Sequence, residues 1–380
     1  MENQNGNKKL AVSILSLSLL TVMAGAAVAP ALDVIREHFS SAGSFAIQMV
    51  ISMPAIFIVL TNLVFPELCR RIRVRSLLMI GLLLYTVGGV AAGAMNSIGM
   101  VLAARALVGI GVGIVMPLST GLLPYYFSRD KQDILMGYAS AMNQMGAAVA
   151  TLISGVLATF SWRASFLVYL MGLISIVLCL RYLPNDYIGA EKKKGGRGLF
   201  RKNASFVIAM FILMVTFFIY PADFAMETVS AGVIDPRFIA PIMASMDLVA
   251  FFGGLAFVHV KHLTGRWMRF VAPLMFLAGY LLLRFLGGWA GTLLGSWMIG
   301  FANGLGIPFI IAAATKKAGR AAAATVMPLI SAALYLGQFL TPMILSCVRA
   351  AASGVSHLPY MTAIVTAVIL VICSAQIKEE

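Results

Sequence analysis

Long apolar runs alternate with short polar or charged stretches along the whole chain. A helix needs about 20 mostly apolar residues to cross roughly 30 Å of hydrocarbon. The runs of that length extend over residues 10–32, 44–66, 76–95, 99–121, 134–158, 165–183, 204–226, 238–258, 269–287, 290–314, 322–348 and 358–376. The pattern therefore predicts an all-α integral membrane protein with twelve transmembrane helices.

Composition agrees with this pattern and excludes soluble classes. Apolar residues make up 61% of the 380 and charged residues 11%, whereas a soluble domain averages about 45–50% apolar and about 25% charged residues. The four cysteines stand singly among apolar runs, so neither a disulfide framework nor a metal site is expected.

The first apolar run permits a second interpretation. Lys8 and Lys9 precede it, and it ends in the small residues Ala24 to Ala29, as a cleaved signal peptide would. We interpret the run as a helix that stays in the membrane, because without it the number of crossings would be odd.

Most of the 28 Lys and Arg fall in alternate connections, beginning with Lys8 and Lys9. Positive loops are retained on the cytoplasmic side, so both termini are predicted to be cytoplasmic in a bacterial-type plasma membrane. Arg36, Arg163, Arg237 and Arg349 fall on the other side. The net charge of +14 is thereby explained as loop charge, and no nucleic-acid partner is expected.

The polar stretch 184–203 divides the spans six and six, which predicts bundles at 1–183 and 204–380 joined by a cytoplasmic linker. A shift of 191 positions carries Gly109, Gly113 and Pro117 onto Gly300, Gly304 and Pro308. A repeat of six spans keeps its orientation, so the two six-helix bundles are expected to be related by a pseudo-two-fold axis along the membrane normal.

Two segments resemble motifs of the major facilitator superfamily. Residues 66–75, between spans two and three, share Leu68, Arg71 and Arg75 with its gating loop, although Arg70 stands in place of an aspartate and Glu67 is the candidate substitute. In span four, residues 105–113 match the family pattern except for one glutamine. The resemblance covers essentially the whole chain and implies a drug or metabolite efflux type of transporter.

The resemblance also implies roles for residues within spans. It assigns Arg105 a part in proton transfer, whereas the alternative is an arginine that reaches the headgroups. In span five, Gly146 and Gly155 are kept from the antiporter pattern, but its proline is Thr151, which weakens the export interpretation. Small residues allow close helix packing, and the expected packing positions are Gly109, Gly113, Gly146, Gly155, Gly300 and Gly304.

Few acids lie inside the spans, and each is a candidate for proton coupling. Asp247 lies nine residues after Phe238, roughly 14 Å deep at 1.5 Å per residue, and is the preferred site. Asp223 and Asp33 lie nearer the ends of spans seven and one, where the headgroup region is the alternative position.

Neutral polar residues within the spans are candidates to line a substrate cavity, with hydrogen bonding between helices as the alternative role. They are Gln48, Asn143, Gln144, Tyr220, Asn303, Tyr335 and Gln338.

These features favour a secondary active transporter that exports small amphipathic compounds in exchange for protons by alternating access. Symport of a small organic anion or sugar, with Arg105 as the charge partner of an anion, is the second interpretation; a membrane protein without transport is the third. No phosphate-binding GxxxxGK[ST] loop or cluster of acid–base residues is present, so neither an ATP-driven pump nor an enzyme is expected. A monomer without cofactor or metal is predicted.

Overall fold

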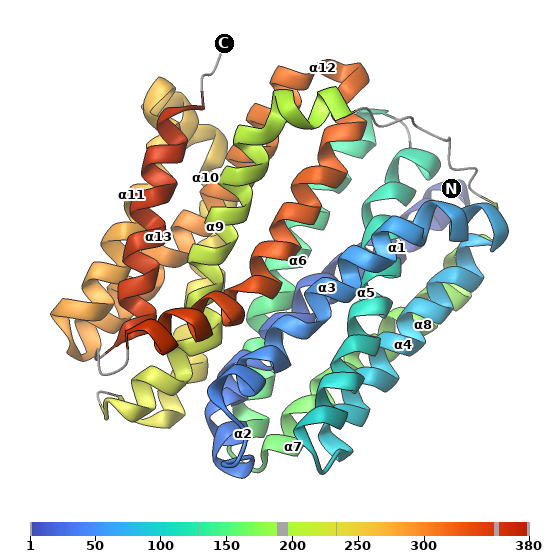
Figure 1. Cartoon of the computed structure of the whole chain (residues 1–380). Helices are drawn as coiled ribbons and strands as arrows, with labels where there is room; N and C mark the ends of the chain where they lie inside the picture. Colours follow the sequence, from blue (N-terminus) through green and yellow to red (C-terminus); the bar gives the residue numbers. More distant parts are fainter. Residues whose placement is uncertain (1, 128, 188–196, 233, 353–356, 378–380) are drawn as a thin grey trace. The chain divides into compact units, whose positions relative to one another are not determined.

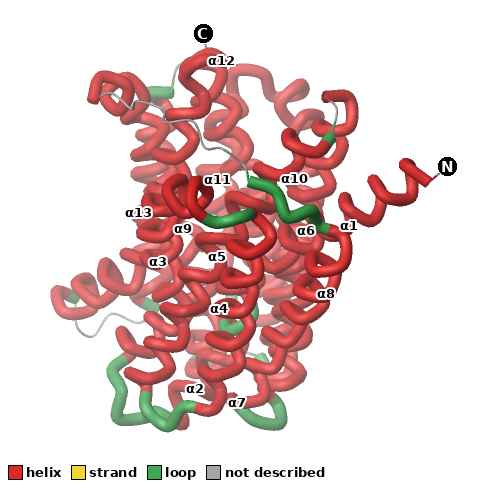
Figure 2. Tube along the Cα trace, turned by 90° about the vertical axis from the view of Figure 1, so that its right-hand side faces the viewer, coloured by secondary structure: helices red, strands yellow, loops and turns green. Residues whose placement is uncertain are grey.

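The computed structural model describes residues 2–127, 129–187, 197–232, 234–352 and 357–377. Helices account for nearly all of these residues, and no strand occurs among them (Figures 1 and 2). The all-α fold predicted from the apolar runs is confirmed. The chain divides into two compact units, Met1–Glu191 and Lys192–Glu380, called unit 1 and unit 2 below.

Unit 1 is built around α5, which packs against α1, α3 and α4, while α6 packs against α1. Its helices are α1 (Glu2–Ala26), the 3-10 segment η1 (Ala29–Ala31), α2 (Leu32–His38), α3 (Ser44–Arg71), α4 (Val74–Ala94), α5 (Ile98–Tyr126), α6 (Arg129–Ala158), α7 (Trp162–Ser165), the 3-10 segment η2 (Phe166–Met171) and α8 (Gly172–Tyr182).

Unit 2 is built around α12, which packs against α9, α10 and α11, while α13 packs against α9 and α11. Its helices are α9 (Arg197–Ser230), η3 (Pro236–Phe238), α10 (Ile239–Thr264), η4 (Gly265–Trp267), α11 (Met268–Leu281), the π-helical turn η5 (Leu282–Leu286), α12 (Gly288–Ala351) and α13 (Leu358–Ala375).

Eleven helical stretches among the described residues are long and apolar enough to cross a membrane, and each of the twelve predicted spans overlaps one of them. The difference arises at Pro236–Leu286, a stretch of 51 residues that covers both 238–258 and 269–287. Its length of roughly 77 Å is enough for two crossings. Gly265, whose φ is +52°, lies between them and gives the backbone a conformation that favours glycine.

Large apolar side chains remain exposed along the helices, including Leu63, Val258 and Ile372. A soluble surface would not carry so many, whereas hydrocarbon is their natural surrounding. The exposed faces therefore agree with a multi-pass membrane protein.

Candidate functional site

Arg105 lies in the centre of unit 1 and is fully buried. Its Nε donates to the carbonyl of Val50 in α3 at 2.7 Å, Nη1 donates to the hydroxyl of Tyr169, and Nη2 donates to the carbonyl of Ala24 in α1. The Tyr169 hydroxyl also donates to Ala24, at 2.8 Å. The guanidinium is thus held by helix carbonyls and does not reach the headgroups.

Asp33 forms a short local ion pair in unit 1. Its Oδ1 lies 2.5 Å from Nη2 of Arg36, one turn later in α2. The carboxylate is largely buried while Arg36 is partly exposed. Arg36 therefore compensates the charge of Asp33 at the end of the first span.

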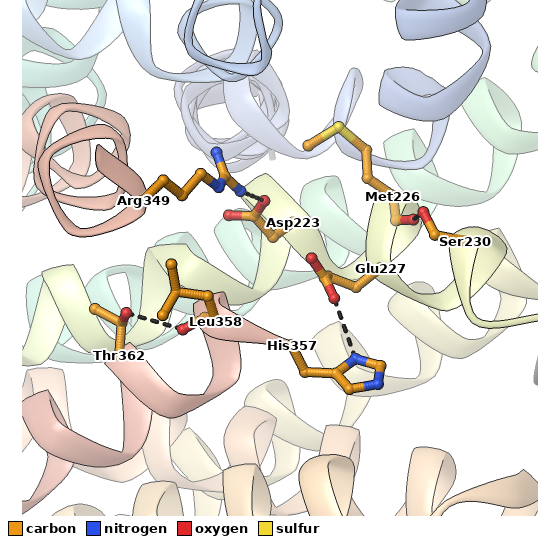
Figure 3. Close-up of polar contacts among 8 residues, drawn as sticks. All are labelled: Asp223, Met226, Glu227, Ser230, Arg349, His357, Leu358 and Thr362. Carbon is orange, nitrogen blue, oxygen red and sulfur yellow. Dashed lines mark hydrogen bonds and ion pairs between the residues drawn. The ribbon is translucent and has the colours of Figure 1, made fainter. Parts of the chain in front are cut away.

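Asp223 is the most buried acid among the four coupling candidates, with 1% of its surface exposed. Its Oδ1 lies 2.6 Å from Nη2 of Arg349, which α12 presents from 126 positions further along the chain (Figure 3). The sequence pattern had placed Arg349 only among the loop charges. The structure instead brings it into an ion pair inside unit 2.

A second polar contact between side chains lies beside the first in unit 2. Glu227, one turn after Asp223 in α9, places Oε2 3.2 Å from Nδ1 of His357, the residue before α13 (Figure 3). The His357 ring stacks on Tyr360 at 6.2 Å between centroids. The end of α9 is thereby linked to both α12 and α13.

Asp247 differs from the other acids because it is partly exposed within α10. Its carboxylate lies close enough to Tyr220 of α9 for an electrostatic interaction. The Tyr220 hydroxyl donates to Oγ of Ser296 at 2.8 Å, and Ser296 donates to the carbonyl of Thr292. This polar chain leads from α9 into α12. The sequence analysis missed its serine and threonine because both are common in packed membrane helices.

The cavity candidates divide between the two units. In unit 1, Gln48 is buried, Gln144 is partly buried, and Asn143 accepts a 2.7 Å hydrogen bond from Thr21 of α1. In unit 2, Tyr220, Asn303 and Gln338 are buried and Tyr335 is partly exposed. Asn143 thus joins helices, as expected of a polar residue in a span, and a role of the set in substrate binding stays a prediction.

The predicted gating residues lie at the end of α3 and the start of α4, where side-chain contacts hold the connection between the two helices. Glu67 pairs with Arg70 at 2.9 Å and with Arg71 at 2.7 Å, and all three side chains are well exposed. Arg75 donates to the carbonyl of Leu180 at the end of α8. The Glu67 pairs are exposed, so each contributes at most about 1 kcal/mol. The gating role of Glu67, Arg70, Arg71 and Arg75 stays a prediction.

Glycines of both units lie where helix backbones touch. A Cβ at Gly109 would lie 2.4 Å from the Pro54 carbonyl oxygen, and one at Gly113 would lie 2.6 Å from Thr61. In unit 2, a Cβ at Gly300 or Gly304 would lie 2.3 or 2.1 Å from a carbonyl oxygen of α10. The contact of α3 with α5 is thus repeated by α10 with α12. Gly155 is partly exposed on α6.

Gly146 gives a direct test of this packing. A Cβ there would lie 2.0 Å from the carbonyl oxygen of Leu19, so Gly146→Ala is expected to separate α1 from α6 and to destabilise the protein by about 1–3 kcal/mol. Thermal unfolding in detergent measures the loss. Gly121→Ala is the matched control, because a Cβ at that position would meet no described atom within 4 Å. Equal melting temperatures for the two variants would contradict the packing role of Gly146.

Comparison with known proteins decides the family. A sequence profile described as Major Facilitator Superfamily matches residues 14–342. The chain belongs to this superfamily. Its members are membrane transporters, not enzymes, and the resemblance drawn from residues 66–75 and 105–113 is confirmed.

Relatives of this chain include efflux and vitamin transporters. The riboflavin transporter RibZ of Clostridioides difficile (strain 630) is 22% identical over 149 residues, which are 39% of this chain and 33% of that protein. The multidrug efflux pump SdrM of Staphylococcus aureus (strain N315) is 23% identical over 192 residues, 50% of this chain and 42% of that protein. The match thus spans less than half the length of these curated relatives.

A solved structure extends the likeness over almost the whole chain. The inward-facing, unoccupied bacterial homologue of the human lysosomal transporter Spinster superposes with a TM-score of 0.75 at 15% identity, and the match covers 97% of this chain and 96% of that one. At this identity the likeness establishes the superfamily fold.

Proposed function

We propose that this superfamily member is a secondary active transporter that exports small amphipathic compounds in exchange for protons by alternating access. The observation that carries the proposal is Asp247, an ionisable and partly exposed side chain inside a membrane-spanning helix. An acid at this depth is costly to keep, so a functional role is the default explanation.

The surroundings of the other acids support Asp247 as the proton acceptor. Asp33 and Asp223 are buried, with 7% and 1% of their surfaces exposed. Asp247 is more open, as a group must be if it is to exchange protons with water during each cycle. We assign the exchange step to Asp247 and the stabilisation of α9 to the Asp223–Arg349 pair.

Export is favoured over symport of an organic anion by the position of Arg105. An imported organic anion would need a basic partner that it can reach, and Arg105 is fully buried with its donors directed to Val50, Tyr169 and Ala24. A cationic or neutral amphipathic substrate needs no such partner. The efflux function of SdrM agrees with this choice.

The distribution of charge supports an orientation. We propose that both termini, the linker 184–203 and the loop of Glu67, Arg70, Arg71 and Arg75 face the cytoplasm, because positive loops are retained on that side. The proposed location is the plasma membrane of a bacterial-type cell, and the proposed working unit is a monomer.

Flux in proteoliposomes tests the proposal. Ethidium represents amphipathic cations, riboflavin represents the compound named for RibZ, and carboxyfluorescein represents organic anions. We expect a pH gradient to drive ethidium or riboflavin against the direction of proton flow, and protein-free liposomes are the control. Carboxyfluorescein flux in the direction of the protons would support symport instead, and flux of each probe without response to the gradient would contradict proton coupling.

A further inference from the structure

Three segments of unit 1 in which regular α-helical hydrogen bonding is interrupted adjoin Arg105. The helix α1 ends at Ala26 and continues as 3-10 turns over Ala29–Ala31. The helix α3 contains Pro54. The segment Phe166–Met171, which carries Tyr169, is a 3-10 helix between α7 and α8.

The first contact of Arg105 compensates for a proline. Pro54 has no N–H, so it cannot donate to the carbonyl of Val50, four residues earlier in α3. Water is not present in hydrocarbon to satisfy such a carbonyl, and neighbouring helices must supply the donor. Arg105 Nε donates to this carbonyl at 2.7 Å. The arginine thus replaces the amide that Pro54 lacks.

The second contact compensates for the break in α1. A regular α-helix would direct the N–H of Val28 to the carbonyl of Ala24, but this N–H donates to Gly25 at 3.2 Å. The Ala24 carbonyl instead accepts from Nη2 of Arg105 and from the Tyr169 hydroxyl. Two side chains from α5 and η2 therefore satisfy the carbonyl at the point where α1 stops being regular.

Glycines bring the three segments close enough for these contacts. Gly109, one turn after Arg105, lies directly on the backbone of Pro54, where a Cβ would be 2.8 Å from the proline Cα. This contact sets Arg105 level with Val50, one turn before Pro54. Gly89 similarly lies against Tyr169, because a Cβ there would be 2.1 Å from the ring.

We propose that Arg105 and Tyr169 are positioning residues that supply the donors missing at the breaks of α1 and α3, and so hold both helices in register on α5. This role differs from the proton transfer that the family resemblance implies for Arg105. A guanidinium suits it because its several N–H groups diverge in one plane and reach two helices at once. Only the transport part of the test below rests on the proposed function.

Unit 2 contains a related arrangement. Pro221 lies inside α9 and cannot donate to the carbonyl of Phe217. The hydroxyl of Tyr280 from α11 lies 3.5 Å from this carbonyl oxygen and donates to the neighbouring carbonyl of Thr216 at 2.6 Å. In each unit, a side chain from an adjacent helix thus donates at one of the prolines within a helix, Pro54 in unit 1 and Pro221 in unit 2.

Pro54→Ala restores an N–H opposite Val50 and allows a double-mutant cycle. Arg105→Met in the natural background is expected to lower the melting temperature by about 2–5 °C and to raise amide exchange at residues 24–31 and 50–55 about tenfold. In the Pro54→Ala background, the additional effect of Arg105→Met on residues 50–55 is expected to fall by more than half. Arg284→Met is the control for loss of an arginine from an apolar span. Equal effects of Arg105→Met in both backgrounds would overturn the proposal.

Transport measurements distinguish a positioning role of Arg105 from a role in proton transfer. In the Pro54→Ala background, Arg105→Met is expected to slow ethidium flux but to keep its dependence on the pH gradient. Flux that persists but no longer responds to the gradient would assign Arg105 to proton transfer. Tyr169→Phe provides a milder second variant, expected to raise exchange at residues 24–31 with an unchanged pH profile, and a changed pH profile would overturn the proposal. Exchange and melting do not require transport, so failure of the proposed function would be recognised separately.

Discussion

Replacing Asp247 with asparagine is expected to abolish flux driven by a pH gradient while leaving the yield of folded protein unchanged. Asparagine has nearly the same shape and still forms hydrogen bonds, but it cannot bind and release a proton. Asparagine also fills nearly the same volume as aspartate, and Asp247 is only partly buried. The substitution is therefore not expected to leave a cavity. Ethidium flux in proteoliposomes, with and without a gradient, measures the effect, and we expect at least about a tenfold loss of the gradient-driven component.

Asp235→Asn is the matched control for this experiment. Asp235 lies between α9 and η3, outside the candidate spans, and pairs with Arg237 at 2.7 Å on the exposed surface. The same chemical change at this position is expected to leave flux unaltered. Gradient-driven flux that survives Asp247→Asn would remove Asp247 from the coupling step.

Breaking the pair of Asp223 and Arg349 is expected to destabilise unit 2. Arg349→Ala removes the ion-pair partner of a carboxylate that is 1% exposed, and such losses cost about 3–5 kcal/mol for buried pairs. The Arg349 side chain is 29% exposed, so water screens part of the interaction and we expect the lower end, about 3 kcal/mol. Unfolding of the purified protein in detergent measures the loss.

A double-mutant cycle distinguishes the pair from its separate residues. Asp223→Asn combined with Arg349→Gln leaves two neutral groups that can still hydrogen bond, so the double substitution is expected to cost less than Arg349→Gln alone. Arg237→Ala is the control, since its pair with Asp235 is exposed. Additive effects of the Asp223 and Arg349 substitutions would contradict direct coupling.

The amino-acid sequence predicted the fold well because the bilayer imposes a simple rule on it. Spans need long apolar runs, and their backbone polar groups must be satisfied within helices. Residues 238–258 and 269–287 were therefore found as separate crossings although the helical stretch Pro236–Leu286 joins them. Motif residues such as Gly109 also gave the superfamily, because close helix contacts restrict which side chains fit.

The candidate site was harder to predict because it depends on contacts between distant residues. Arg349 looked like one more loop charge, and only the packing of α12 on α9 shows that it meets Asp223, 126 positions away. Tyr169 gave no periodic signal that distinguishes it from other aromatic residues in spans. The proline at position 54 did contain a usable signal, since it frees the Val50 carbonyl that Arg105 satisfies.

Proton movement driven by a substrate gradient tests the central claim most directly. Proteoliposomes containing a pH-sensitive dye in the lumen are given an inward gradient of ethidium, with no pH gradient at the start. Exchange predicts that protons leave as ethidium enters, so the luminal pH rises, and that the rise disappears in Asp247→Asn. A constant luminal pH during ethidium entry, or a fall, would contradict exchange of substrate for protons.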